Sequence, residues 1–130
     1  MKLALSRALN PPAPMVPVIV GAPKGIDMVA LEGKLDTGAD LCAVPDHLVM
    51  DLNLPPLRTV RAAGFLTGVQ EVIVYGIGLT IDKMEFPYVE AIITRRPYVI
   101  VGRNVLRRLV MHMDGPAERL ELRRPRERKT

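Results

Sequence analysis

Proline and glycine interrupt this sequence so often that every apolar stretch is short. Its 130 residues include 12 prolines and 10 glycines, and 48% of the residues are hydrophobic. Between these breaks the chain is rich in valine, isoleucine and leucine, which suit the pleated surface of a sheet better than a long helix. No apolar run approaches the roughly 20 residues that a membrane-spanning helix needs. We therefore expect one domain of short β-strands around a modest core, with no membrane segment.

The order of apolar runs and breaks predicts strands joined by turns. Alternation and β-branched residues indicate strands, and apolar residues three or four apart indicate short helices. The expected strands cover residues 15–20, 28–35, 41–44, 58–62, 69–81, 86–94, 98–101, 110–113 and 119–122, and the expected helices cover 45–52 and 103–109. This pattern is typical of an all-β fold, a small closed barrel or folded antiparallel sheet, with one or two short helices.

The two ends of the sequence differ in composition from its middle. Residues 1–13 are predicted to be a flexible N-terminal segment, because a proline-rich spacer follows at residues 10–14. The opening residues are too few and too soon interrupted for a secretory signal. Residues 123–130 are predicted to be a disordered basic tail, which leaves the domain at residues 14–122.

The basic character of the protein comes from that tail. Residues 123–129 hold five positive charges and one negative charge, a net of +4, which equals the formal net charge of the whole chain. The rest is therefore neutral (4 − 4 = 0), which argues against a basic nucleic-acid-binding face. Nucleic-acid binding through the tail is an alternative, and deleting residues 123–130 would test it.

Cysteine and histidine give no sign of a disulfide or a metal centre. The single cysteine, Cys42, excludes an intramolecular disulfide, so a reducing, cytoplasmic setting is the expectation. Its apolar surroundings in sequence favour an inert core thiol. His47 and His112 are far apart and lack the spacing of metal ligands. We expect neither a metal nor a cofactor.

The most distinctive chemistry lies between two apolar strands, at residues 34–40. The run KLDTGAD places an acid, a hydroxyl, a glycine and a second acid in one tight turn. A carboxylate at the end of a rigid strand is where catalytic groups are often found. The simpler alternative is an ordinary β-turn whose aspartate bonds its own backbone. Alternation predicts that Lys34 and Asp36 leave one face of the strand and that Leu35 leaves the other.

A second stretch makes this turn part of a larger pattern. Residues 99–106 (VIVGRNVL) form an apolar strand, then Gly-Arg-Asn, then a short apolar helix, about 65 residues after Asp36-Thr37-Gly38. A glycine-flanked turn at residues 63–68 lies between them. In order and spacing, residues 15–114 resemble the retroviral-type (retropepsin-like) aspartic peptidase family, with the turn at 63–68 in the position of the family's flap.

The resemblance implies roles for individual residues. Asp36 corresponds to the catalytic aspartate, Thr37 to a residue whose hydroxyl bonds into the partner subunit, and Gly38 to a glycine whose backbone meets substrate. Asp40 and Arg103 correspond to an ion pair that braces the turn and faces substrate backbone. The simpler alternative for Arg103 is a surface charge at the start of a helix.

The same resemblance implies how a peptide would bind, extended between the turn and the flap by strand-like hydrogen bonds. The residues expected to contact it are Lys34, Ala39, Asp40, Gly64, Phe65, Leu66, Tyr98 and Ile100. Tyr98 and Ile100 share one face of their strand and predict a preference for apolar or aromatic residues, while Val99 and Val101 face the core. Gly102 lets the strand pass close beneath the catalytic turn. An ordinary surface hairpin is the alternative to the flap.

Lys34 departs from the family, which usually has an apolar residue at this position. A cation on the pocket side could select an acidic or polar group of the substrate, or change the proton affinity of the catalytic pair. It could equally extend into solvent.

The chemistry implies a homodimer. Hydrolysis requires two carboxylates around one water, and this chain contains one Asp-Thr-Gly. The second carboxylate must then come from another copy across a twofold axis. At about 3 Å and an effective dielectric of about 20, two charged carboxylates repel by roughly 5 kcal/mol, so the pair shares one proton. The strands at 15–20 and 110–113 are the candidates for the interface.

The leading hypothesis is therefore a homodimeric aspartic endopeptidase that acts on extended polypeptides. The alternative is a binding or dimerisation module that keeps the fold with little or no proteolytic activity. Both hypotheses accommodate Asp36-Thr37-Gly38.

Overall fold

The computed structural model describes residues 1–64 and 68–126, and within them the chain forms ten strands and two short helices. The strands are β1 (Lys2–Ala4), β2 (Met15–Gly21), β3 (Met28–Leu35), β4 (Cys42–Pro45), β5 (Pro56–Gly64), β6 (Gly68–Ile81), β7 (Met84–Thr94), β8 (Val99–Val101), β9 (Val110–Asp114) and β10 (Arg119–Arg123). The helices are α1 (His47–Asp51) and α2 (Arg103–Leu106). Neither described helix is long enough to cross a membrane.

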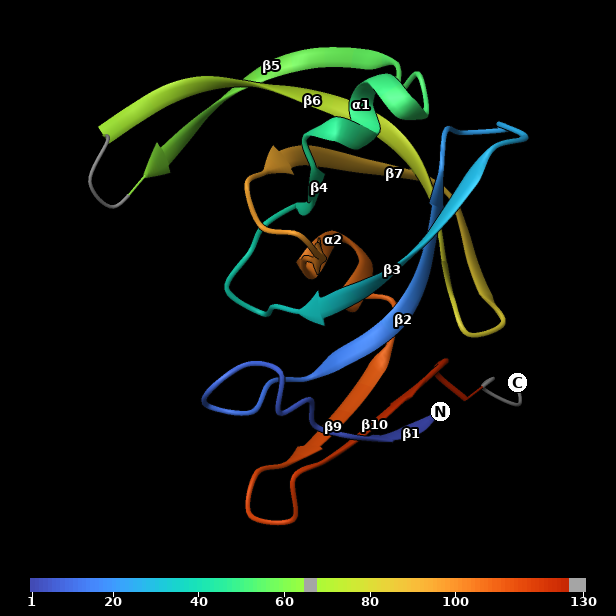
Figure 1. The fold of residues 1–130 in the computed structure, drawn as a ribbon, viewed down its shortest axis with the longest axis vertical. Helices are drawn as coiled ribbons and strands as arrows, with labels where there is room; N and C mark the ends of the chain where they lie inside the picture. The colour runs from blue at the N-terminus through green and yellow to red at the C-terminus, as the bar shows by residue number, and fades with distance from the viewer. Residues whose placement is uncertain (65–67, 127–130) are drawn as a thin grey trace.

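A seven-stranded sheet forms the body of the domain and folds back on itself. Its order is β2-β3-β8-β4-β7-β6-β5, and β2 also pairs with β6 (Figure 1). The predicted all-β fold with two short helices is confirmed, but the sheet is mixed, because β3–β8 and β4–β7 are parallel. A parallel pair needs a long connection between its strands, and β8 comes back to β3 after the whole of β4 to β7.

The core inside this folded sheet is aliphatic. Alternate residues of the strands point inward and are fully buried, as expected for strands with one face on a core. They include Val16 and Val20 of β2, Ile77 and Ile81 of β6, and Val99 and Val101 of β8. Each such side chain contributes about 1.5–3 kcal/mol on burial. The predicted inward orientation of Val99 and Val101 is thereby confirmed.

A second, three-stranded sheet has the order β1-β10-β9 and holds the start of the chain. The structure differs here from the flexible segment expected at residues 1–13. Lys2–Ala4 pairs antiparallel with residues 119–121, and the Leu5 N–H donates to the Glu118 carbonyl at 2.8 Å. The physical reason is that Leu5 buries its side chain in the core, while β10 offers β1 an open strand edge.

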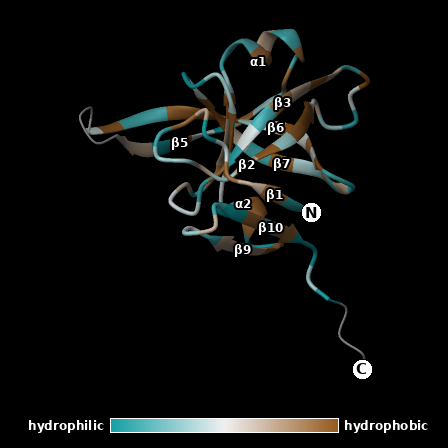
Figure 2. Ribbon diagram, turned by 60° about the horizontal axis from the view of Figure 1, so that its bottom comes forward, coloured by the Kyte–Doolittle hydropathy of each residue, from teal (hydrophilic) through white to brown (hydrophobic). Residues whose placement is uncertain are grey.

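Residues 15–20 and 110–113, the strands expected to form the dimer interface, differ in how open their edges are. Residues 18–21 of β2 pair with β6, so this part of β2 is not an open edge. In contrast, β9 is an outer strand of the three-stranded sheet. After β10, which ends at Arg123, residues 124–126 are hydrophilic and lead away from the two sheets (Figure 2). Residues 127–130 of the predicted tail lie outside the described residues.

Candidate active site

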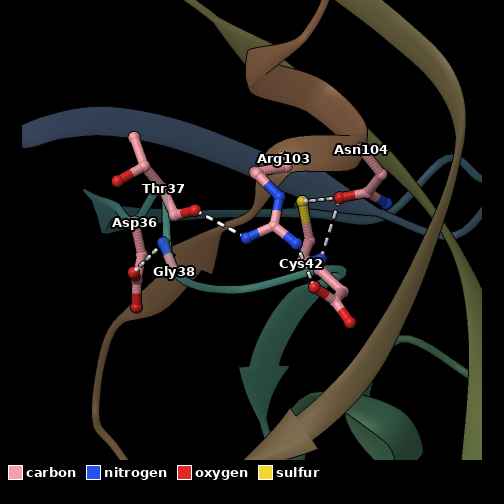
Figure 3. A network of polar contacts seen from close by, with 7 residues as sticks. Asp36, Thr37, Gly38, Cys42, Arg103 and Asn104 are labelled. Carbon is pink, nitrogen blue, oxygen red and sulfur yellow. Dashed lines mark hydrogen bonds and ion pairs between the residues drawn. The ribbon is translucent and has the colours of Figure 1, made fainter.

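Asp36 lies directly after β3, in a turn whose backbone is fixed to β8. Its N–H donates to the carbonyl of Val101 at 2.9 Å, which extends the β3–β8 pairing by one residue. The Gly38 N–H donates to Asp36 Oδ1 at 2.9 Å, and the Ala39 N–H donates to the Asp36 carbonyl at 3.3 Å (Figure 3). Asp36 is half-buried and the Gly38 N–H holds its carboxylate, so the position of this group is set before any ligand arrives.

Arg103, the first residue of α2, fastens the other side of this turn. Its guanidinium donates to the Thr37 carbonyl at 2.7 Å and to the carboxylate of Asp40. Its backbone N–H donates to the Ala39 carbonyl at 2.8 Å. The expected Asp40–Arg103 ion pair is therefore present. The side chains of Asp40 and Arg103 are 84% and 51% exposed, so the pair alone contributes about 1 kcal/mol or less, and the bonds to Thr37 and Ala39 fix its geometry.

Thr37 and Gly38 form the outermost part of the turn, and both are exposed. In Figure 3 the Thr37 carbonyl points toward Arg103, while its hydroxyl points away from it. The tip of the turn is thus uncovered in a single copy of the chain. The turn alternative predicted from sequence shares the Asp36–Gly38 bond, but not the bonds that Arg103 makes from 66 residues away.

Gly102 allows β8 to run against the chain that leaves the turn. A Cβ at this position would lie 2.5 Å from both the carbonyl carbon and the oxygen of Leu41, and 3.0 Å from the Cys42 nitrogen. Cβ atoms essentially never come this close to other heavy atoms. The close passage expected for Gly102 is therefore present, and it leaves no space for any side chain.

Asn104 has a role that the sequence analysis missed. Its Oδ1 accepts from the Cys42 N–H at 3.0 Å and from the Cys42 thiol at 3.3 Å, and its Nδ2 donates to the Glu90 carbonyl at 2.9 Å. The Glu90 carboxylate in turn pairs with Arg58 of β5 at 2.6 Å. Asn104 thus joins α2, β4 and β7 beneath the turn. The signal in the sequence was a polar residue directly after Gly-Arg, in the first turn of a helix whose next two residues, Val105 and Leu106, are apolar and buried.

Cys42 is fully buried at the centre of this network, which matches the expected core thiol. Burial raises the pKa of the thiol from 9.0 to about 11, although the Gly102 N–H, which donates to Sγ at 3.4 Å, acts in the opposite direction. The neutral thiol is therefore the form that the folded protein favours.

We expect Cys42 to resist alkylation in the folded protein. At pH 8, a pKa higher by about two units lowers the thiolate fraction about 100-fold relative to the unfolded chain, and burial slows access further. The neutral thiol stabilises the fold below pH 9, and this contribution is lost as the pH rises toward 11, because the folded state then binds more protons than the unfolded state. Mass spectrometry after iodoacetamide treatment, with and without denaturant, measures the difference. Equal rates would contradict this expectation.

Lys34, Tyr98 and Ile100 lie beside the turn. Lys34 is in register with Ile100 of β8 and with Met15 of β2, and residues in register share a face of the sheet. Lys34, Tyr98 and Ile100 are half-buried, whereas Leu35 is only 4% exposed and belongs to the core. The predicted alternation of Lys34, Leu35 and Asp36 therefore agrees with their burial.

The hairpin of β5 and β6 occupies the position expected of the flap. Its strands pair from Pro56–Tyr75 out to Gly64–Gly68, and in Figure 1 it projects from the body on the side where the turn after β3 lies. Gly64 ends β5. Phe65 and Leu66, which were predicted to contact substrate, lie outside the described residues.

No protein-family model matches the chain, and no curated protein matches it by sequence. Solved structures do match its fold. A retropepsin-like aspartic protease from Rickettsia conorii has a TM-score of 0.66 at 18% identity, over 94% of this chain and 88% of that one. The simian foamy virus protease has a TM-score of 0.53 at 16% identity, over 70% and 91%. The EIAV protease in complex with the inhibitor HBY-793 has a TM-score of 0.51 at 20% identity, over 73% and 86%.

These matches define the fold. The chain has the retropepsin-like fold, and it is structurally similar to aspartic proteases of that class. At 16–20% identity the similarity concerns the arrangement of the backbone. Any catalytic activity therefore depends on the particular residues of the turn.

Proposed function

We propose that this chain is one subunit of a homodimeric aspartic endopeptidase, with Asp36 of each copy forming the catalytic pair. The observation that carries the proposal is the position of Asp36. Its carboxylate stands at the end of β3, held by the Gly38 N–H, in a turn braced by Arg103 within a retropepsin-like fold. An ordinary surface turn has no need of such bracing from a distant helix.

The second carboxylate of the pair has to come from a partner copy. Within one chain the next acidic residue of the turn is Asp40, and its carboxylate is engaged by Arg103. Thr37 and Gly38, by contrast, are exposed in the single copy. A twofold axis beside these two residues would bring the two turns together and place both Asp36 carboxylates around one water. In this arrangement the Thr37 hydroxyl reaches into the partner subunit.

The reaction then follows from one shared proton. Repulsion between two adjacent carboxylates prevents both from being charged, so one is an acid and the other a base. The charged carboxylate accepts a proton from the water, whose oxygen attacks the carbonyl carbon of the peptide bond. The protonated carboxylate donates to the carbonyl oxygen. The first carboxyl group, now protonated, then donates its proton to the amide nitrogen, and the second, now charged, takes up a proton from a hydroxyl of the tetrahedral intermediate. The C–N bond breaks, an acid and an amine are released, and the pair returns to its starting state with one shared proton.

The substrate of this site is an extended polypeptide. Gly38 is exposed on one side, and the hairpin of β5 and β6 offers a covering strand pair on the other. Ala39 lies beside Gly38, but its N–H and carbonyl are already bonded to Asp36 and Arg103. Tyr98 and Ile100 provide half-buried apolar surface beside the turn, which favours apolar or aromatic residues next to the cleaved bond. As the resemblance implies, Gly64, Phe65 and Leu66, which follow Ala63 in the sequence, are proposed to contact the bound peptide.

Dilution of the protein tests the shared site directly. We expect the activity per subunit to fall as the dimer dissociates, because a single copy lacks the second carboxylate. The measurement is cleavage of a fluorescently labelled, unstructured polypeptide over a concentration series, with the dimer fraction followed by sedimentation velocity. Activity per subunit that stays constant in the monomer range would contradict a shared pair. A stable dimer that cleaves nothing would support the binding-module alternative instead.

A further inference from the structure

We propose that Lys34 selects substrates with an acidic side chain next to the cleaved bond. The proposal rests on the peptidase function proposed above and adds the class of peptide that the site accepts. It starts from the position of Lys34 relative to Asp36. The two residues leave the same face of β3, and their Cα atoms are separated by roughly 7 Å, the rise of two strand residues. A lysine side chain spans this distance, so its ammonium can reach the space beside the reacting bond.

The surroundings of Lys34 leave its charge available to a ligand. Its register neighbours on the two flanking strands, Met15 and Ile100, are both apolar. Lys34 is half-buried, yet it belongs to none of the ion pairs found within residues 1–64 and 68–126. The other cation at the turn, Arg103, is occupied by Asp40 and Thr37. Lys34 is therefore the cation of this site that a substrate carboxylate would meet.

Two acidic residues lie on the same face as Lys34, but neither occupies its ammonium group. By alternation, Glu32 of β3 and Asp36, directly after β3, share the face of Lys34. Neither forms an ion pair with Lys34 in the described structure, and Asp36 is directed to the Gly38 N–H. In a twofold dimer each copy supplies one Lys34. An acidic residue on either side of the cleaved bond would therefore meet one of them.

Matched peptides that differ only in charge test the proposal. We expect wild-type protein to cleave a peptide with glutamate next to the cleaved bond about 10- to 100-fold more efficiently than the same peptide with glutamine, the range for a hydrogen bond to a charged group. The ratio of the two kcat/KM values is measured at about pH 6, where a free glutamate is ionised. The same ratio should fall at high salt, because the ammonium is partly exposed.

Variants then assign the preference to Lys34. We expect Lys34→Met to bring the Glu/Gln ratio close to one, Lys34→Arg to retain the preference, and Lys34→Glu to shift it toward peptides with lysine. The matched control is Lys83→Met, which removes the same charge from the exposed turn between β6 and β7 and should keep the wild-type ratio.

The possible results distinguish a failure of the role proposed for Lys34 from a failure of the proposed peptidase function. Wild-type protein that cleaves the Glu and Gln peptides equally would overturn the role of Lys34 and leave the peptidase intact. Retention of the preference in Lys34→Met would overturn it too. If wild-type protein cleaves neither the labelled polypeptide nor the matched peptides, the proposed peptidase function itself fails. The salt dependence uses wild-type protein alone, so the test does not depend on a variant that folds.

Discussion

Replacement of Asp36 by asparagine is expected to lower kcat/KM by at least about 1,000-fold while the protein stays folded. Asparagine keeps an Oδ1 that can accept from the Gly38 N–H, which holds the side chain at 2.9 Å in the native turn. It cannot take up or release the proton that the reaction requires, and loss of one member of a catalytic unit typically removes most of the rate enhancement. Cleavage of the unstructured polypeptide gives the activity, and circular dichroism and sedimentation give the fold and the oligomeric state.

Mixing of subunits extends this result to the partner copy. An excess of Asp36→Asn chains should suppress the activity of wild-type chains, because each mixed dimer has only one carboxylate at the shared site. The matched control is Asp46→Asn, which makes the same chemical change at an exposed residue that precedes α1 and makes no cap hydrogen bond with its side chain. Asp36→Asn protein that retains a tenth or more of the wild-type activity would refute the assignment of Asp36.

Gly102→Ala should destabilise the protein by about 3 kcal/mol or more. Overpacking usually costs about 1–3 kcal/mol, because side chains can move aside. Here the added Cβ would meet the carbonyl group of Leu41 at 2.5 Å, and these backbone atoms belong to the chain between the turn and β4. Relief of the clash would separate Gly102 from that chain and lengthen the neighbouring bond from the Arg103 N–H to the Ala39 carbonyl. Chemical denaturation measures the change in the free energy of unfolding.

Gly115→Ala is the matched control for this effect. The same methyl group at Gly115, in the turn between β9 and β10, has no heavy atom within 4 Å. We expect a change within about 1 kcal/mol, on the stabilising side if the unfolded chain loses freedom. If Gly102→Ala unfolded at the same denaturant concentration as Gly115→Ala, the close passage beneath the turn would have no importance for the fold.

Local patterns in the sequence predicted the strands well, because each strand is marked by its own residues. The prediction of 28–35 coincides with β3, and that of 69–81 differs from β6 by one residue. The pairing of strands is different, since alternation says which face a residue occupies but not which strand lies beside it. The insertion of β8 between β3 and β4, parallel to β3 and antiparallel to β4, therefore could not be read from the sequence. The pairing of β1 with β10 was missed for the same reason, because proline-rich residues hid a short strand with a distant partner.

In the candidate site, too, residues in local motifs could be predicted, whereas contacts between distant residues could not. Asp36, Gly102 and Arg103 were expected at the site because they stand in two local motifs, Asp-Thr-Gly and Gly-Arg-Asn, that resemble those of the retropepsin-like family. Asn104 and Cys42 were not connected, because their hydrogen bonds cross 62 residues of sequence. The residue types alone carry no trace of the pairing. The position of Lys34 on the face of Asp36 followed from alternation, and its lack of an ion-pair partner in the described residues could be established only from the structure.

Because the turn at residues 36–40 is held by β8 and α2, the site can form only after these later elements have been synthesised. Among residues 1–64 and 68–126, the hydrogen bonds that hold residues 36–40 from outside the turn come from Val101, Arg103 and Asn104, more than 60 residues after Asp36. Contacts between such distant segments are slow to form, because the intervening chain must first be ordered. A nascent chain that ends before Val101 contains the Asp-Thr-Gly sequence without the geometry that orients it. The chain is therefore expected to remain inert until β8 and α2 have been made and have packed against the turn.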